Sequence, residues 1–515
     1  MKSKIVLLVC IFSLLFPNFC FSQWGTLDLT FGIGGKVRNS SGTNIHDSAV
    51  QSDGKIIVVG STLSFNEGSS FVVTRYLANG NVDTSFGTGG SVKTLYGFRC
   101  SAKSLHIQND GKIIVAGSTY LTAQVNSEAA IMLAKYNTNG SLDMSFGTNG
   151  VAVLNLPNSQ DVRTMVVKAD GTIIVGGIFN IQDGEEPRSV ALVGFDDNGN
   201  LNTAFGNNGY VFGDGYVLDM KLTATEDIIT VGRGEMNAYM ISKYTANGQI
   251  VNSFGASGNG TIEFSMNYIT ELSKCVIANN GDIYATGATY ATGLEYKAYT
   301  VKYNQAGIID ASFGVNGMIL RDWGRFIASF GNDIAIDQNN NLIIAYSVGM
   351  PTNYDFGVES YDLAGNINTD FGNNGYFTTT FTDSHEYLRA MSIQPDNKIV
   401  LSGDMFGQVL ARLNNPVVLS NNDFSKNEEK INIIPNPFIF NAELSFEIDK
   451  SGKIAVDLFD SKGAFISNLI KDKYCKEGTN SLRLNLSDIN LPQGLYFLKV
   501  YNDFKAYKTL KLLKK

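Results

Sequence analysis

The chain has 515 residues, of which 17% are charged and 53 are glycine, and its formal net charge is −8. Low charge with many glycines and aromatics is typical of turn-rich β-structure, because strands need β-branched and aromatic side chains and their hairpins need glycine. Residues 23–430 alone carry a net charge of −14. An acidic body without a basic stripe argues against nucleic acid as a partner.

The first predicted element is a secretory signal peptide over residues 1–22. Lys2 and Lys4 precede an uncharged apolar run, and small residues near its end predict cleavage before Gln23. A lipid anchor on Cys20 is disfavoured, because a bulky residue precedes it. The apolar run is shorter than the ~20 residues that a spanning helix needs, and no later segment qualifies, so we expect no transmembrane segment.

A repeat then dominates the chain. A Phe-Gly pair occurs seven times, at residues 31, 86, 146, 205, 254, 313 and 371, within the phrase Tyr-x-x-x-Gly-x-Leu-Asp-x-Ser-Phe-Gly-x-x-Gly that is clearest at 136–150. A second phrase, Asp-Gly-Lys-Ile-Ile-Val-x-Gly, runs in step with it at 53–60 and 110–117. A fixed period of this length indicates a repeat architecture.

Each repeat predicts four short antiparallel strands. In the unit 101–156 these are 102–108, 112–117, 130–136 and 151–156, and Asp-Gly and Asn-Gly supply the turns between the first and second and between the third and fourth. Four such strands, repeated, form the blade of a β-propeller. An open β-solenoid is the structural alternative.

The phase of the repeats favours a closed ring. The Phe-Gly phrase begins at 24–37, before any first strand, and nothing follows the last third strand at 408–413. We therefore expect the amino-terminal strand to complete the last blade, which removes the open sheet edges. The fold class is thus all-β, a seven-bladed β-propeller over 23–415 that is closed by its amino-terminal strand.

The residues of the motif have structural explanations. Each Phe is expected to pack between neighbouring blades, and the Gly after it to allow close approach or an unusual φ. The Asp-x-Ser of copies such as Asp143 and Ser145 is expected to cap a turn. Recurrence in blade after blade supports this interpretation, because an active site is normally needed once.

The two phrases, best seen at 140–147 and 110–117, resemble the bacterial delta-60 repeat. The resemblance covers roughly residues 24–415. It implies a large secreted or surface protein without an established activity.

A polar segment at 416–430 is predicted to be a linker, and 431–515 to be a small C-terminal β-sandwich with strands near 444–448, 454–459, 481–486, 494–501 and 508–513. This module resembles the type A sorting domain of the type IX secretion system of the Bacteroidota. The resemblance rests on Pro435, Asn436, Pro437, Gly494, Tyr496, Lys514 and Lys515. It implies the type IX secretion machinery as a partner, and a protein that is secreted or attached to the outer-membrane surface.

The uniform turns of the repeat lie at one end of the strands, and the variable connections lie at the other. Variable loops on a rigid scaffold usually carry binding, so we expect an unidentified glycan or protein ligand on the variable face. The aromatic candidates in these loops are Phe65, Tyr120, Phe179, Tyr290, Trp323 and Tyr354. No catalytic, metal or cofactor motif stands out. The favoured function is a binding or adhesion module, and the alternative is a polysaccharide- or peptide-processing enzyme that uses loop carboxylates.

Overall fold

The computed structural model describes residues 24–415 and 431–515, except for short connecting segments. These are 63–67, 124–127, 157–160, 184–185, 214, 235–236, 266–268, 292–294, 322–327, 351–352, 382–385, 406, 449–450, 461–464, 488, 490 and 503–504. The expected signal peptide (1–22) and linker (416–430) lie outside the described residues. The chain forms two compact units, Met1–Val418 and Leu419–Lys515, and every named element of the described part is a β-strand. The all-β prediction is confirmed. Among the described residues, no helix is long and apolar enough to cross a membrane.

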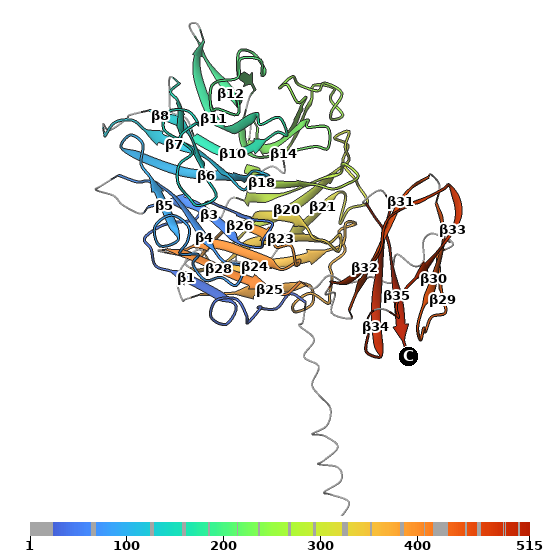
Figure 1. Cartoon of the computed structure of the whole chain (residues 1–515). Helices are drawn as coiled ribbons and strands as arrows, with labels where there is room; N and C mark the ends of the chain where they lie inside the picture. The colour runs from blue at the N-terminus through green and yellow to red at the C-terminus, as the bar shows by residue number, and fades with distance from the viewer. Residues whose placement is uncertain are drawn as a thin grey trace, which may run out of the picture. The chain divides into compact units, whose positions relative to one another are not determined.

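The first unit contains seven four-stranded antiparallel sheets (Figure 1). In six of them the strands follow chain order. These are β2–β5 (Asp47–Val50, Ile56–Ser61, Phe71–Tyr76, Ser91–Thr94), β6–β9 (Arg99–Ile107, Ile113–Tyr120, Ala129–Tyr136, Val151–Leu154), β10–β13 (Asp161–Val167, Ile173–Asp183, Glu186–Phe195, Tyr210–Phe212), β14–β17 (Tyr216–Leu222, Ile228–Arg233, Tyr239–Tyr244, Thr261–Phe264), β18–β21 (Ile269–Ile277, Ile283–Ala291, Glu295–Tyr303, Met318–Arg321) and β22–β25 (Ala328–Ile336, Leu342–Met350, Asn353–Tyr361, Tyr376–Thr379). The seventh sheet combines β26 (Tyr387–Ile393), β27 (Ile399–Asp404) and β28 (Gln408–Leu413) with β1 (Lys36–Asn39).

The first strands of the seven sheets form a closed cycle. In the order β2, β6, β10, β14, β18, β22 and β26, each contacts the next, and β26 contacts β2. These seven inner strands therefore surround one axis. The seventh sheet of this cycle is completed by the expected amino-terminal strand, because β1 pairs with β28 from Lys36 opposite Ala411 to Asn39 opposite Gln408. Figure 1 shows the blue β1 beside the orange β28.

A second cycle joins the sheets at their repeat turns. The glycine of each Phe-Gly pair donates its backbone N–H to a carbonyl in the turn of the next sheet, at N···O distances of 2.8 to 3.2 Å. The seven pairs are Gly32–Asn79, Gly87–Asn139, Gly147–Asn198, Gly206–Asn247, Gly255–Ala306, Gly314–Ala364 and Gly372–Trp24. The last pair again uses the amino-terminal segment, so seven sheets share seven such bonds.

The Phe of the motif packs as the sequence predicts. Phe146 is 1% exposed and shares a core with Val193 and Phe195 of the next sheet. Gly147 has φ 54°, a left-handed conformation in which a side chain would be strained. A Cβ on Gly147 would also lie 2.3 Å from the carbonyl oxygen of Val151. The expected roles of the Phe and the Gly are confirmed.

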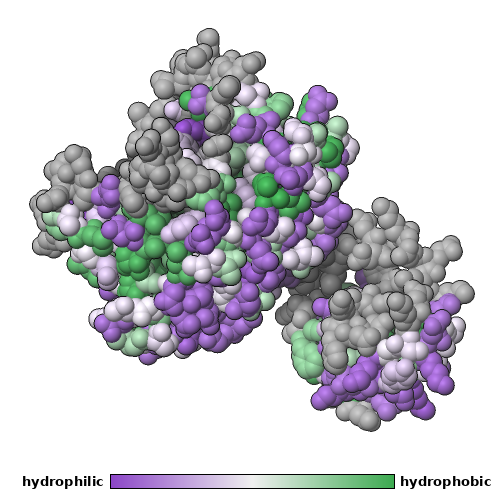
Figure 2. Space-filling view, turned by 90° about the horizontal axis from the view of Figure 1, so that it is seen from above, coloured by the Kyte–Doolittle hydropathy of each residue, from purple (hydrophilic) through white to green (hydrophobic). Residues whose placement is uncertain are grey.

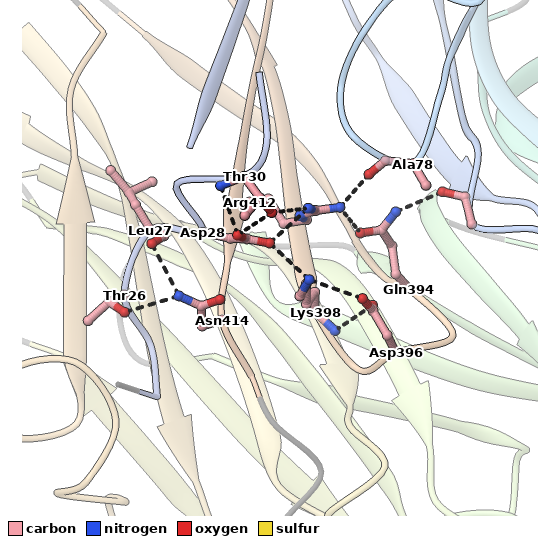
Figure 3. A network of polar contacts seen from close by, with 11 residues as sticks. Thr26, Leu27, Asp28, Thr30, Ala78, Gln394, Asp396, Lys398, Arg412 and Asn414 are labelled. Atoms are coloured by element: carbon pink, nitrogen blue, oxygen red, sulfur yellow. Dashed lines mark hydrogen bonds and ion pairs between the residues drawn. The ribbon is translucent and has the colours of Figure 1, made fainter. Parts of the chain in front are cut away.

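Figure 3 shows the polar network around the closing segment. Asp28 Oδ2 lies 2.8 Å from Arg412 Nη2 and 3.0 Å from Lys398 Nζ. Arg412 also donates to the backbone carbonyl of Ala78 in the first sheet and lies over the Phe31 ring, 4.7 Å from its centroid. The arginine thus connects the last sheet, the amino-terminal segment and the first sheet.

The second unit has two sheets that share one apolar core. One contains β29 (Asn432–Ile434), β30 (Ala442–Ile448) and β33 (Gly478–Leu484). The other has the order β32 (Phe465–Cys475), β31 (Gly452–Phe459), β34 (Gly494–Asn502) and β35 (Lys505–Lys514). Phe446 of the first sheet and Val456, Leu498 and Leu512 of the second lie in this core, fully buried.

Candidate functional site

The repeated Asp-x-Ser is a structural element. Asp143 Oδ1 accepts hydrogen bonds from the Ser145 backbone N–H at 3.2 Å and from its hydroxyl at 2.6 Å. Asp143 Oδ2 lies 2.9 Å from Lys112 Nζ. The bonds from Ser145, followed by the Lys112 ammonium, lower the pKa of Asp143 to about 2. Asp83 and Asp310 accept the same bonds from the serines two residues later, so the predicted turn cap is confirmed.

The two ends of the strands differ in the side chains that they expose. At the repeat-turn face, the exposed large hydrophobic residues are aliphatic. They are Leu29, Ile33, Met144, Ile250, Ile308, Ile309, Val315 and Ile367. At the variable face, where the second-to-third and fourth-to-first connections lie, five aromatic rings are exposed. They are Tyr96, Tyr120, Tyr216, Phe264 and Tyr387; the aliphatic Leu95, Leu121, Ile269 and Leu320 are exposed at this face as well. Among the described residues of the first unit, all large aromatic side chains in the exposed class therefore lie at the variable face. Figure 2 shows hydrophobic side chains (green) gathered in patches among hydrophilic ones (purple) on the side of this unit that it presents.

The predicted aromatic candidates fall into different environments. Tyr120 ends β7 and is 39% exposed. Phe179 is 1% exposed and lies in the same core as Phe146, so the prediction of an exposed loop aromatic there is wrong. The physical reason is that β11 continues to Asp183, which places Phe179 within a strand. Tyr354 is 8% exposed. Phe65 and Trp323 lie outside the described residues, as does the side chain of Tyr290.

Tyr354 belongs to a row of rings that crosses three sheets. The ring centroids of Tyr296 and Phe330 are 4.9 Å apart, those of Phe330 and Tyr354 5.7 Å, and those of Tyr354 and Tyr387 5.6 Å. The row ends at Tyr387, which is 38% exposed and has the Arg389 guanidinium 5.1 Å from its ring centroid. Packed rings of this kind hold the last one in a fixed orientation.

Four of the five exposed rings are absent from the sequence-based candidates. Tyr216 and Tyr387 begin inner strands, Phe264 ends β17, and Tyr96 lies between β5 and β6. Each is within three residues of a strand end at a variable connection, whereas the sequence analysis selected rings from the interiors of the connections. Position relative to the strand ends is the signal that would have found them.

Carboxylates on the variable face are engaged with neighbouring groups. Asp161 Oδ2 lies 2.5 Å from Arg163 Nη2, and Asp404 Oδ1 lies 2.6 Å from Arg389 Nε. Glu386 is fully buried and accepts the Phe381 N–H at 2.7 Å. No group of three or more potential metal ligands occurs in the described part of the chain. These carboxylates give the enzymatic alternative no specific support.

In the second unit, the predicted sorting residues come together at the final strand. Asn436 Nδ2 donates to the Lys511 carbonyl and Asn436 Oδ1 accepts the Leu513 N–H, both at 2.8 Å. Gly494 pairs with Lys514 and Tyr496 with Leu512 in the β34–β35 ladder. Lys515 N donates to the Phe438 carbonyl at 3.0 Å, directly after Pro437. The short motif near Pro435 and the carboxyl-terminal strand are thus one structural feature.

Two family models match parts of the chain. Residues 51–86 and 108–146 match a β-propeller domain of unknown function, DUF5122. Residues 432–515 match a secretion system C-terminal sorting domain. A search among curated proteins finds no match.

Solved structures resemble the chain only distantly. YCF48 from Cyanidioschyzon merolae is 9% identical, with a TM-score of 0.41 over 73% of this chain and 98% of that one. A protein of unknown function from Dyadobacter fermentans is 10% identical, with a TM-score of 0.38 over 74% and 100%. The polysaccharide lyase Uly1 is 10% identical, with a TM-score of 0.40 over 72% and 90%. Similarities this weak say nothing about activity.

Proposed function

Because the chain carries DUF5122 β-propeller repeats and a type IX secretion sorting domain, we propose that it is an exported binding or adhesion protein. The sorting domain implies export, with secretion or attachment to the cell surface as the outcome. In this proposal the seven sheets are the blades of one closed propeller and the two C-terminal sheets form a sandwich. The signal peptide starts export, and the variable face binds a glycan or protein ligand.

The observation that carries the proposal is the segregation of exposed aromatic rings. Tyr96, Tyr120, Tyr216, Phe264 and Tyr387 all lie at the variable face, and the opposite face exposes aliphatic side chains. Aromatic side chains supply a large contact area with little loss of rotamer freedom, and tyrosine adds a hydroxyl for hydrogen bonding. A rigid ring of sheets holds these side chains in place, as a binding surface requires.

A glycan array with the mature protein, followed by titration of each hit, tests this proposal. Tyr387→Ala and Tyr120→Ala are expected to weaken binding about tenfold or more, as is typical of buried aromatic contacts in interfaces. Ile309→Ala is the matched control, because Ile309 is 40% exposed on the opposite face, against 39% for Tyr120. Equal effects of the three variants would contradict the proposal. Release of shortened glycans during the assay would favour an enzyme instead.

A further inference from the structure

The inner strands share a β-bulge at one level of the ring. Pairing with the second strand shifts by one residue between Ala102 and Ser104, between Val162 and Thr164 and between Leu388 and Ala390. The extra residues are Lys103, Arg163 and Arg389. A bulge removes its residue from the regular pleat and re-aims the side chain.

His46 holds the same position in the first sheet. It directly precedes β2, and its backbone N–H donates to the carbonyl oxygen of Val59 at 2.8 Å. It also stands fourteen residues before Gly60, as Lys103 does before Gly117, Arg163 before Gly177 and Arg389 before Gly403. Four equivalent positions therefore carry a basic side chain.

These four residues, called the axial cluster, lie on neighbouring inner strands or, for His46, directly before one. The inner strands β26, β2, β6 and β10 contact one another in that order around the axis. The bulge positions of the other three sheets are uncharged, with Leu218, Ser273 and Asn332. Basic residues at the bulge position are thus confined to one arc of the ring.

Solvent reaches the axial cluster. Ala102 and Ser104 are buried while Lys103 between them is half-buried. The side chains of Arg163 and Arg389 are 39% and 37% exposed, although their sequence neighbours are buried. Because the inner strands enclose the axis, the bulged side chains meet solvent there.

Two members of the cluster lack a direct ion pair with any described residue. Arg163 pairs with Asp161 and Arg389 with Asp404, but among the described residues the Lys103 and His46 side chains have no hydrogen bond or ion pair. Burial, and then the Lys103, Arg389 and Arg163 charges, hold the pKa of His46 well below its ordinary value. Burial also lowers the pKa of Lys103. The Asp161 charge acts to raise this pKa, and the charges of Arg163 and Arg389 lower it further.

The nearby acid Asp47 binds backbone groups, and within the described part of the chain no ion pair joins it to a side chain of the cluster. Its carboxylate accepts the N–H groups of Leu105 at 3.0 Å and of Ser48 at 2.9 Å. The same level of the opposite arc pairs Asp219 with Lys221 at 2.9 Å and with Lys274 at 3.5 Å.

We propose that the axial cluster is an anion-binding site for the carboxylate or sulfate group of an acidic saccharide. The proposal rests on the binding role proposed above for the variable face. Tyr387 favours a saccharide, because its exposed ring lies against Arg389 and could stack on a sugar while the cluster binds the charge. Charge-assisted hydrogen bonds from lysine and arginine are the usual way that proteins hold such groups.

The test is calorimetric titration of the mature protein with a galacturonate tetrasaccharide, a galactose tetrasaccharide and inorganic sulfate. Lys103→Met removes the cation that has no ion pair and keeps most of the side-chain volume. Lys93→Met is the matched control, since Lys93 is exposed on the outermost strand β5. Thermal melting followed by circular dichroism verifies that both variants fold.

We expect the acidic tetrasaccharide to bind at least tenfold more tightly than the neutral one, and to weaken as salt increases. Lys103→Met is expected to weaken acidic binding about tenfold and leave neutral binding unchanged, with no effect of Lys93→Met. Equal binding of the two saccharides, or equal effects of the two variants, would overturn the anion site and leave the binding face intact. Sulfate binding that requires Lys103, with no saccharide bound, would overturn the saccharide assignment and the glycan-binding role. Tighter binding of an oligoglutamate peptide would reassign the site to an acidic peptide.

Discussion

Replacing Asp28 with Asn tests whether the amino-terminal segment holds the ring of sheets closed. The side chains of Asp28 and Arg412 are each 6% exposed, and their charged atoms lie 2.8 Å apart. The substitution keeps the shape of the side chain but removes the charge. Arg412 would then be a buried cation without its carboxylate partner, which is strongly destabilising.

The pKa of Asp28 gives the size of the stabilisation that its charge contributes. Burial acts to raise this pKa, but hydrogen bonds from Thr30 and the Lys398 and Arg412 charges outweigh it and lower the pKa from 3.8 to about 2. That difference corresponds to about 2 kcal/mol of stabilisation. Because the folded-state pKa is depressed, the contribution is present above pH ~4 and is lost as the pH falls toward 2. Loss of one partner of a buried pair adds to this, so we expect Asp28→Asn to cost about 2–4 kcal/mol.

Trypsin cleavage at Lys36 and Arg38 reports directly on the closing strand, since both residues lie in β1. We expect Asp28→Asn to accelerate this cleavage at least about thirtyfold, the factor that corresponds to ~2 kcal/mol, because cleavage follows the population of the open strand. Asp143→Asn is the matched control. Asp143 caps the equivalent turn and forms an ion pair with Lys112, but all four strands of its sheet follow one another in the chain. Equal cleavage of the two variants, or a wild-type rate in Asp28→Asn, would refute the role of Asp28 in closure.

Phe146→Ala is expected to lower the free energy of unfolding by about 3–5 kcal/mol in urea titrations, because it empties a core shared by two sheets. Burial raises the pKa of Asp333 to about 6, so the folded protein takes up a proton there as the pH falls from 6 toward 4. The free energy of unfolding of the wild type is therefore expected to rise relative to that of Asp333→Asn over this range, and urea midpoints measured across it check the sign. Asn436→Ala removes two 2.8 Å hydrogen bonds to the final strand and is expected to cost about 2 kcal/mol and reduce the fraction of protein found outside the cells. Asn480→Ala removes bonds within one hairpin; an equal loss of export there would contradict a specific role of Asn436.

The sequence allows the repeated strands and their closure to be predicted because each depends on local chemistry. The Asp-Gly turn at Gly111 has φ 82°, and Gly140 in the Asn-Gly turn has φ 89°, so only turn-forming residues suit these positions. Strand β3 is buried at all six positions, which explains its unbroken apolar run. β32 was not predicted, because this edge strand exposes polar and charged residues such as Lys471 and Asp472 and lacks an alternating pattern.

The candidate sites were harder to predict because they depend on register and on strand length. Phe179 looked like a loop residue, since nothing in its sequence marks the extension of β11 to Asp183. The axial cluster combines different residue types, such as His46 and Arg163, that are far apart in the chain. What they share is a bulge that the packing of sheets around the axis produces. Aligning the repeats on Gly60 and its equivalents would have grouped them, because the fourteen-residue offset is constant.

The meeting of Trp24 with Asn415 has a consequence for how the chain can be cut and rejoined. The Trp24 indole N–H donates to the Asn415 side chain, and Gly25 N donates to Asn414 O at 2.8 Å. The two termini of the seven-sheet unit are therefore adjacent. A short peptide joining them would make the unit circularly permutable, with new ends between the third and fourth strands of any other sheet. In each permuted chain a different sheet would be assembled from both ends.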